Sequence, residues 1–100
     1  MLKHVVMWKL KESAEGRNKA ENALIVKEML DLLPYKIKEV KNLEVGINIL
    51  NTPPSYDLIL IVDFSNLLDL QTYQAHPEHV KVADHILKVR ETRAVVDYEY

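Results

Sequence analysis

The side chains of this sequence with the greatest chemical capacity lie close together in one short segment, which runs from Tyr73 to His79. His79 carries an imidazole that titrates near neutrality, so in a partly buried setting it can accept or release a proton at cellular pH. Tyr73 carries a hydroxyl that can orient or polarise a carbonyl group. The segment is therefore a candidate site for acid–base chemistry.

A structural role is the alternative for the same segment. In that interpretation His76 caps a helix and His79 hydrogen-bonds a backbone group, so that the two histidines fix a break in the chain. Six positions separate Tyr73 from His79, and on one continuous helix the two side chains would point to different sides. Pro77 lies between them and interrupts the helix, so the bend can bring both side chains to one cavity.

A third candidate, His4, lies on a predicted strand and shares one face of it with Val6 and Trp8. That face should point toward the helices and toward any cavity that they leave. A histidine with satisfied hydrogen bonds in the core is the alternative for this position. The residues that we expect to contact a ligand, in addition to the Tyr73 and His79 pair, are His4, Trp8, Leu60, Val62 and His76.

We expect neither a zinc ion nor a cofactor, and the sequence leaves open a weak site for a hard cation such as magnesium. His76 and His79 lie on either side of a proline, not four residues apart on a helix as in zinc-binding His-Glu-x-x-His segments, and no third ligand is placed. Gly16 and Gly46 are the only glycines, so the chain has no glycine-rich loop that could hold phosphates.

Length, charge and composition narrow the classes of protein to which the chain could belong. A chain of 100 residues fits one domain, residues 1–100. The net charge of −2 provides no positive field for nucleic acid, and no apolar run approaches the ~20 residues of a membrane span. The N-terminus lacks the apolar core of a signal peptide, and the chain has no cysteine. We therefore expect a cytoplasmic protein.

Hydropathy patterns predict four strands and three helices that could position these side chains. The strands are expected over residues 3–11, 36–50, 56–64 and 92–100, the second with an irregular start around residues 37–40. The helices are expected over residues 17–33, 65–74 and 77–90. Ser65 is the expected N-cap of the second helix, and Pro77 the expected first residue of the third. The order β-α-β-β-α-β predicts an α+β ferredoxin-like fold, in which a four-stranded antiparallel sheet carries its helices on one face.

The opposite face of that sheet is also apolar, which a solvated face would not favour. The helices should cover the side with Val6, Trp8, Leu60 and Val62. The uncovered side presents Val5, Met7, Ile59 and Ile61. Two such sheets packed face to face would bury these residues, so we expect a homodimer through this face.

Several motifs resemble those of a known family. The segment Y-x-x-H-P-x-H-V at residues 73–80 is the most specific, and a K-H-x-V opening at residue 3 and a D-Y near the C-terminus accompany it. The chain resembles the stress-responsive dimeric A/B barrel (Dabb) domain family over nearly its whole length. The resemblance implies a ferredoxin-like monomer whose sheet packs against that of a second copy, forming a dimeric α/β barrel.

Some plant relatives in this family are polyketide cyclases, and the resemblance implies matching roles here. Their catalytic tyrosine corresponds to Tyr73 and their catalytic histidine to His79, whereas a further pocket histidine falls at Leu58. We expect cofactor-free acid–base catalysis on a small carbonyl compound, such as a cyclisation or isomerisation, with His79 as base and Tyr73 as carbonyl-polarising donor. The alternative is a non-enzymatic protein that binds a small molecule or has a structural role in stress.

Overall fold

Alternating burial along the first strand shows which of its side chains face the core. The computed structural model describes residues 1–100, and in β1 (Leu2–Leu10) every second residue, beginning with Leu2, is buried. The residues between them are half-buried. This period-two pattern is typical of a sheet with one face packed on a core. His4, Val6 and Trp8 therefore share the covered face, as the sequence predicts.

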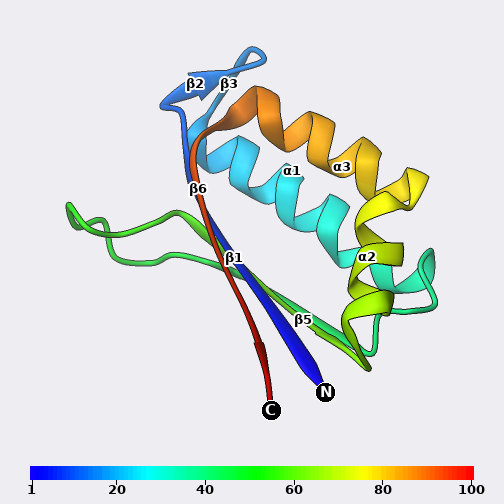
Figure 1. The fold of residues 1–100 in the computed structure, drawn as a ribbon. Coiled ribbons are helices and arrows are strands. Elements are labelled where there is room, and N and C mark those ends of the chain that lie inside the picture. The colour runs from blue at the N-terminus through cyan, green and yellow to red at the C-terminus, as the bar shows by residue number, and fades with distance from the viewer.

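The elements follow the expected order, with a small hairpin added after β1 (Figure 1). The other strands are β2 (Ser13–Ala14), β3 (Arg17–Asn18), β4 (Asn42–Ile47), β5 (Leu58–Phe64) and β6 (Arg90–Glu99). The helices are α1 (Lys19–Asp31), α2 (Leu67–Ala75) and α3 (Pro77–Val89), together with the short 3-10 helix η1 (Leu33–Tyr35). No helix combines the length and the apolar character that crossing a membrane requires.

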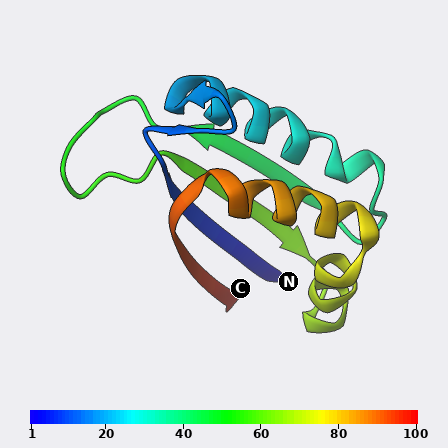
Figure 2. The same ribbon diagram turned by 90° about the horizontal axis from the view of Figure 1, so that it is seen from above.

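One four-stranded antiparallel sheet holds the molecule together, in the order β4-β5-β1-β6. In its register, His4 of β1 lies between Val62 of β5 and Asp97 of β6. The long helices α1 and α3 lie side by side on one face of the sheet and leave the other face open (Figures 1 and 2). This is the predicted ferredoxin-like α+β fold.

The core fills the space between the sheet and the helices. The four residues predicted on the covered face, Val6, Trp8, Leu60 and Val62, are all buried. On the open face the predicted residues are only half-buried in the single chain; they are Val5, Met7, Ile59 and Ile61. Val96 lies opposite Val5 on the same face and is 61% exposed. The open face is therefore a continuous apolar surface.

The first helix is shorter than the predicted range of residues 17–33. Residues 17 and 18 belong to the β2–β3 hairpin, and the Asn18 side chain caps α1 by accepting from the backbone N–H of Glu21, whose carboxylate accepts in return from the Asn18 N–H. On this helix Leu24 is exposed, whereas Asn22 and Val26 face the core.

The predicted strand over residues 36–50 is too long at both ends. After η1, which contains Pro34, the chain continues through turns that bury Ile37, and pairing with β5 starts only at Asn42. It stops at Ile47, because the chain then leaves the sheet in the loop that follows, where Ile49 is 91% exposed. Alternation of apolar and polar residues along the sequence does not by itself distinguish apolar residues of turns and loops from those of strands.

The start of the second helix is also corrected by one residue. Asn66, not Ser65, is the N-cap of α2, and its side-chain oxygen accepts from the backbone N–H of Asp69. The break at the end of this helix is confirmed. His76 has extended backbone angles and is at once the C-cap of α2 and the N-cap of α3, in which Pro77 is the first residue.

Candidate functional site

A cleft of about 350 Å³ lies between the covered face of the sheet and α3. Its apolar lining includes Val6, Trp8 and Leu60 from the sheet, together with Val82 and Ile86 from α3. Its polar lining consists of His4, His79, Asp84, Arg90 and Arg93. A small molecule of this size could therefore meet both an apolar surface and several hydrogen-bonding groups.

His4 is held rigidly at the sheet side of this cleft. It is 2% exposed, and its Nδ1 hydrogen-bonds the carboxylate of Asp97, its neighbour across the β1–β6 ladder. Because an ionised carboxylate can only accept, Nδ1 carries the proton in this pair. Its Nε2 has no partner in the chain and is not among the buried polar atoms, so this nitrogen is open to the cleft.

His79 approaches the same cleft from the helix side. Its Nδ1 lies 3.1 Å from the backbone carbonyl oxygen of Gln74, to which it donates, and its Nε2 is likewise neither bonded nor buried. Burial lowers the pKa of His79, opposed by the bond to Gln74 and assisted by the nearby charges of His4 and Arg93. The neutral imidazole, with a free lone pair on Nε2, is therefore the favoured form.

Tyr73 packs behind the two histidines without lining the cleft. Its ring is fully buried and lies 4.5 Å from the His79 ring, 5.0 Å from Phe64 and 6.4 Å from His4, measured between centroids. The hydroxyl has no hydrogen-bond partner, and burial raises the pKa of Tyr73 well above its usual value. The arrangement fixes the His79 ring through ring contact.

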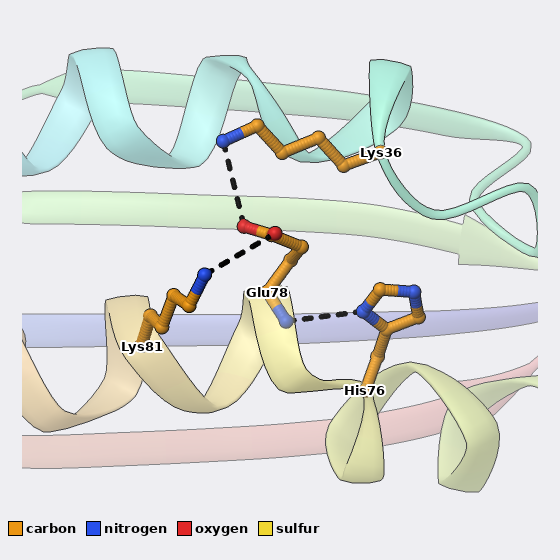
Figure 3. A network of polar contacts seen from close by, with 4 residues as sticks. All are labelled: Lys36, His76, Glu78 and Lys81. Atoms are coloured by element: carbon orange, nitrogen blue, oxygen red, sulfur yellow. Dashed lines mark hydrogen bonds and ion pairs between the residues drawn. The ribbon is translucent and has the colours of Figure 1, made fainter.

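His76 takes the structural role that the sequence left open as an alternative. Its Nδ1 accepts from the backbone N–H of Glu78 at 3.1 Å and so caps α3 (Figure 3). The Glu78 carboxylate lies between Lys36 of the preceding turn and Lys81 of the same helix (Figure 3). Although desolvation acts against it, these two ammonium groups lower the pKa of Glu78. The network fastens α3 to the chain after α1.

The structure thus brings together some of the predicted site residues and not others. His4, Trp8, Leu60 and His79 line the cleft, whereas Tyr73, Val62 and His76 do not. Val62 is fully buried in the core.

Three charged residues near the cleft were not identified from the sequence: Asp97, Arg90 and Arg93. Two of them lie directly across the β1–β6 ladder from predicted site residues, Asp97 from His4 and Arg93 from Trp8. A prediction that extended to strand register could have found this pair. No group of three or more His, Asp or Glu side chains is arranged to hold a metal ion.

Comparisons with known proteins give a consistent picture. A family model described as the stress responsive A/B barrel domain (Dabb) matches residues 2–100. A dimeric ferredoxin-like protein of unknown function from Bacteroides fragilis has a similar structure, with 36% identity, coverage of 99% of this chain and 95% of that chain, and a TM-score of 0.82. No curated protein sequence matches significantly.

Two more distant structures share the fold. A dimeric ferredoxin-like protein of unknown function from Thermobifida fusca has 21% identity, coverage of 99% of this chain and 90% of that chain, and a TM-score of 0.85. A hydroxynitrile lyase from Passiflora edulis has 14% identity, coverage of 97% and 90%, and a TM-score of 0.80.

Proposed function

The chain belongs to the stress responsive A/B barrel (Dabb) family, and we propose that it catalyses cofactor-free proton transfer on a small carbonyl compound in the cleft beneath α3. In this proposal His79 is the base, as the sequence motif implies, and His4 takes the role of carbonyl-polarising donor that the resemblance implies for Tyr73. Trp8 and Leu60 contact the apolar part of the substrate.

One observation carries the proposal: two imidazoles meet at one cleft, and each has its Nδ1 hydrogen-bonded to an acceptor on the protein. Such a bond fixes the ring and leaves Nε2 to act on a ligand. The two acceptors differ, because Asp97 offers a carboxylate to His4 and Gln74 a neutral carbonyl to His79. His4, with a carboxylate at its Nδ1, is therefore suited to act as the acid, and His79, with a neutral carbonyl there, as the base.

The step that this arrangement supports is enolisation. Nε2 of His79 removes a proton from the carbon next to the carbonyl, and the electron pair of that C–H bond becomes the carbon–carbon double bond of the enol. The carbonyl oxygen receives the proton on Nε2 of His4, whose charge is balanced by Asp97. Isomerisation would result if the reverse transfers returned the protons to positions other than those they came from. Cyclisation would result if the enol carbon attacked a second carbonyl group.

Tyr73 is a positioning residue in this proposal. Its hydroxyl is buried away from the cleft, so it reaches no ligand in this arrangement of the chain. Its ring instead supports the His79 ring at 4.5 Å. Correct placement of a base matters for the rate, because proton transfer requires hydrogen-bond distance to the reacting carbon acid.

Exchange of carbon-bound hydrogen for deuterium tests the proposal directly. In heavy water, NMR should show that the protein accelerates deuterium incorporation beside the carbonyl of 4-phenylbutan-2-one or of 2-oxo-4-phenylbutanoate. His79→Gln should lower this rate by about 10²- to 10⁴-fold, the usual contribution of a general base. His76→Asn is the matched control, since it removes a histidine of the same segment that caps a helix outside the cleft and leaves a good N-cap.

Binding without turnover is the second candidate function. It is favoured by the predominantly apolar lining of the cleft and by the burial of the Tyr73 hydroxyl. A wild-type protein that binds both probes in the cleft but exchanges neither would support this function and contradict the catalytic one. An exchange rate unaffected by His79→Gln would also contradict the role of His79.

We also propose that the chain forms a homodimer through its open sheet face, with Val5, Met7, Ile59 and Ile61 in the interface. Support comes from the exposed apolar surface on that face and from the relatives from Bacteroides fragilis and Thermobifida fusca, which are described as dimeric. The cleft lies on the other face of the sheet, between the strands and α3. Dimer formation through the open face would therefore leave the cleft accessible.

A further inference from the structure

Two guanidinium groups line the cleft without an ionic partner. Arg90 is the residue that follows α3, and Arg93 lies three residues further along β6. Both line the cleft, and neither forms a salt bridge or a side-chain hydrogen bond with any residue of the chain. By contrast, five lysines of the chain form salt bridges with carboxylates. These two arginines are therefore free to bind a group from outside the chain.

Strand register directs Arg93 into the cleft. It lies directly opposite Trp8 in the β1–β6 ladder, and cross-strand neighbours point to the same face of a sheet. That face is the one covered by α3, so Arg93 and Trp8 both line the cleft. Its positive charge also reaches His79, where it contributes to the lowered pKa of the imidazole after the larger effect of burial.

The balance of charge in the cleft favours a monoanion. Arg90 and Arg93 contribute two positive charges and Asp84 one negative charge, while Asp97 lies behind His4 and is engaged by it. Arg90 also lies at the C-terminal end of α3, where the helix dipole favours a cation, so a structural role accounts for part of its placement. No such role accounts for Arg93.

Resting on the proposed function above, we propose that the substrates are small oxo acids whose carboxylate binds Arg93, with Arg90 beside it. A guanidinium group offers two parallel N–H donors that match the two oxygens of a carboxylate. The apolar part of the acid would lie on Trp8 and Ile86, and its carbonyl group between His4 and His79. A cleft of about 350 Å³ suits an aromatic ring with a short chain.

A matched pair of probes separates the contribution of the carboxylate to binding from that of the rest of the ligand. The acid 2-oxo-4-phenylbutanoate and the ketone 4-phenylbutan-2-one differ only in a carboxylate that replaces a methyl group. Binding can be followed by amide chemical shifts, or by fluorescence of Trp8, the only tryptophan of the chain. We expect the acid to bind at least about tenfold more tightly than the ketone, the difference made by one charge-assisted hydrogen bond.

Substitution of Arg93 tests the part of this residue in the preference for the acid over the ketone. Arg93→Gln should weaken binding of the acid about tenfold and leave the ketone unchanged, and Arg93→Lys, which keeps the charge but loses the paired donors, should give an intermediate result. Arg17→Gln is the control, because this exposed arginine of β3 does not line the cleft. It should affect neither probe.

Three results would overturn the proposal. They are no binding of the acid at millimolar concentration, equal affinity for the acid and the ketone, and an equal loss of affinity for the acid in Arg93→Gln and Arg17→Gln. These measurements need no turnover and so are independent of the deuterium exchange. If His79→Gln leaves exchange unchanged while Arg93→Gln abolishes the preference for the acid, the proton-transfer function fails and the carboxylate site stands. The reverse pattern rejects the carboxylate site alone.

Discussion

At the residue scale, the charge state of His79 is set by its surroundings. Burial disfavours the imidazolium form, so the pKa of His79 is lower in the folded chain than the usual value of 6.5. Between these two values the unfolded chain binds more protons than the folded chain, and stability therefore rises with pH across the interval. The same shift keeps His79 available as a base in slightly acidic solution.

The pH dependence of unfolding should reveal this effect. We expect the free energy of unfolding, measured by urea denaturation, to fall as the pH is lowered through 6.5 toward the folded pKa, and His79→Gln to lose this contribution. Imidazole NMR should show His79 titrating below 6.5 with its proton on Nδ1. A titration at or above 6.5, or a proton on Nε2 in the neutral form, would contradict this description of the site.

The hydroxyl of Tyr73 can be separated from its ring by two substitutions. Tyr73→Phe removes a buried hydroxyl that has no hydrogen-bond partner, so stability should change by less than about 1 kcal/mol, or increase. Tyr73→Ala also removes a fully buried ring and should cost about 3–5 kcal/mol. Thermal or urea unfolding of both variants measures these differences.

The same pair of variants distinguishes positioning from proton donation. If Tyr73 acts through its ring, Tyr73→Phe should retain deuterium exchange. A folded Tyr73→Phe protein whose exchange rate falls by about 10²-fold or more would instead assign the donor role to the hydroxyl, as the family resemblance implies. The chain would then have to rearrange on binding to expose an atom that is buried here.

At the element scale, the start of α2 depends on a single side chain. Asn66→Ala removes the acceptor for the Asp69 N–H and should lower the free energy of unfolding by about 0.5–2 kcal/mol. Ser65→Ala is the matched control, because the preceding residue makes no side-chain hydrogen bond, and it should change stability by less than about 0.5 kcal/mol. If Ser65→Ala lowered the free energy of unfolding more than Asn66→Ala, the assignment of Asn66 as the N-cap would be wrong.

The strands with strict alternation were predictable, and the irregular connections were not. β1 and β5 alternate over their whole length because one face packs on helices, and this signal is strong in the sequence. Residues 36–50 also contain alternating apolar residues, but Ile37 is buried from a turn and Ile49 is exposed in a loop. Periodicity does not encode these differences, which depend on where the chain leaves the sheet.

The site was predictable to the extent that it lies on regular elements. His4 and Trp8 follow from alternation along β1, and the bend that positions His79 follows from Pro77. The contribution of Arg93 depends on pairing between the first and last strands, which one sequence does not specify. Burial of the Tyr73 hydroxyl depends on close packing against Phe64 and His79, which has no signature in residue spacing.

At the scale of the whole molecule, the two faces of the sheet differ in what they present. The covered face contributes His4, Trp8 and Arg93 to the cleft, and the open face carries an apolar surface that one chain leaves in contact with water. Because side chains alternate between the faces, a substitution on the open face changes no residue of the cleft. The proposed assembly and the proposed ligand binding should therefore be separable by substitution.

Ile61 is the position at which assembly should be most sensitive. It lies opposite Val5 in β1 and Glu44 in β4, near the middle of the open face. In Ile61→Lys a dimer through this face would have to bury an ammonium group, and its desolvation is strongly unfavourable even with the Glu44 carboxylate on the neighbouring strand. Leu24→Lys is the control, because it adds the same charge at an exposed position of α1 on the helical side of the molecule.

Sedimentation equilibrium at micromolar concentration should give the wild type and Leu24→Lys about twice the chain mass of 11.6 kDa. Ile61→Lys should give the chain mass, or aggregate because the apolar face is left exposed. If it aggregates, the wild type still decides the question, since a monomeric wild type would contradict the proposed dimer. A dimer that persists in Ile61→Lys would show that the chains associate through a different surface, and the apolar open face would then need another explanation.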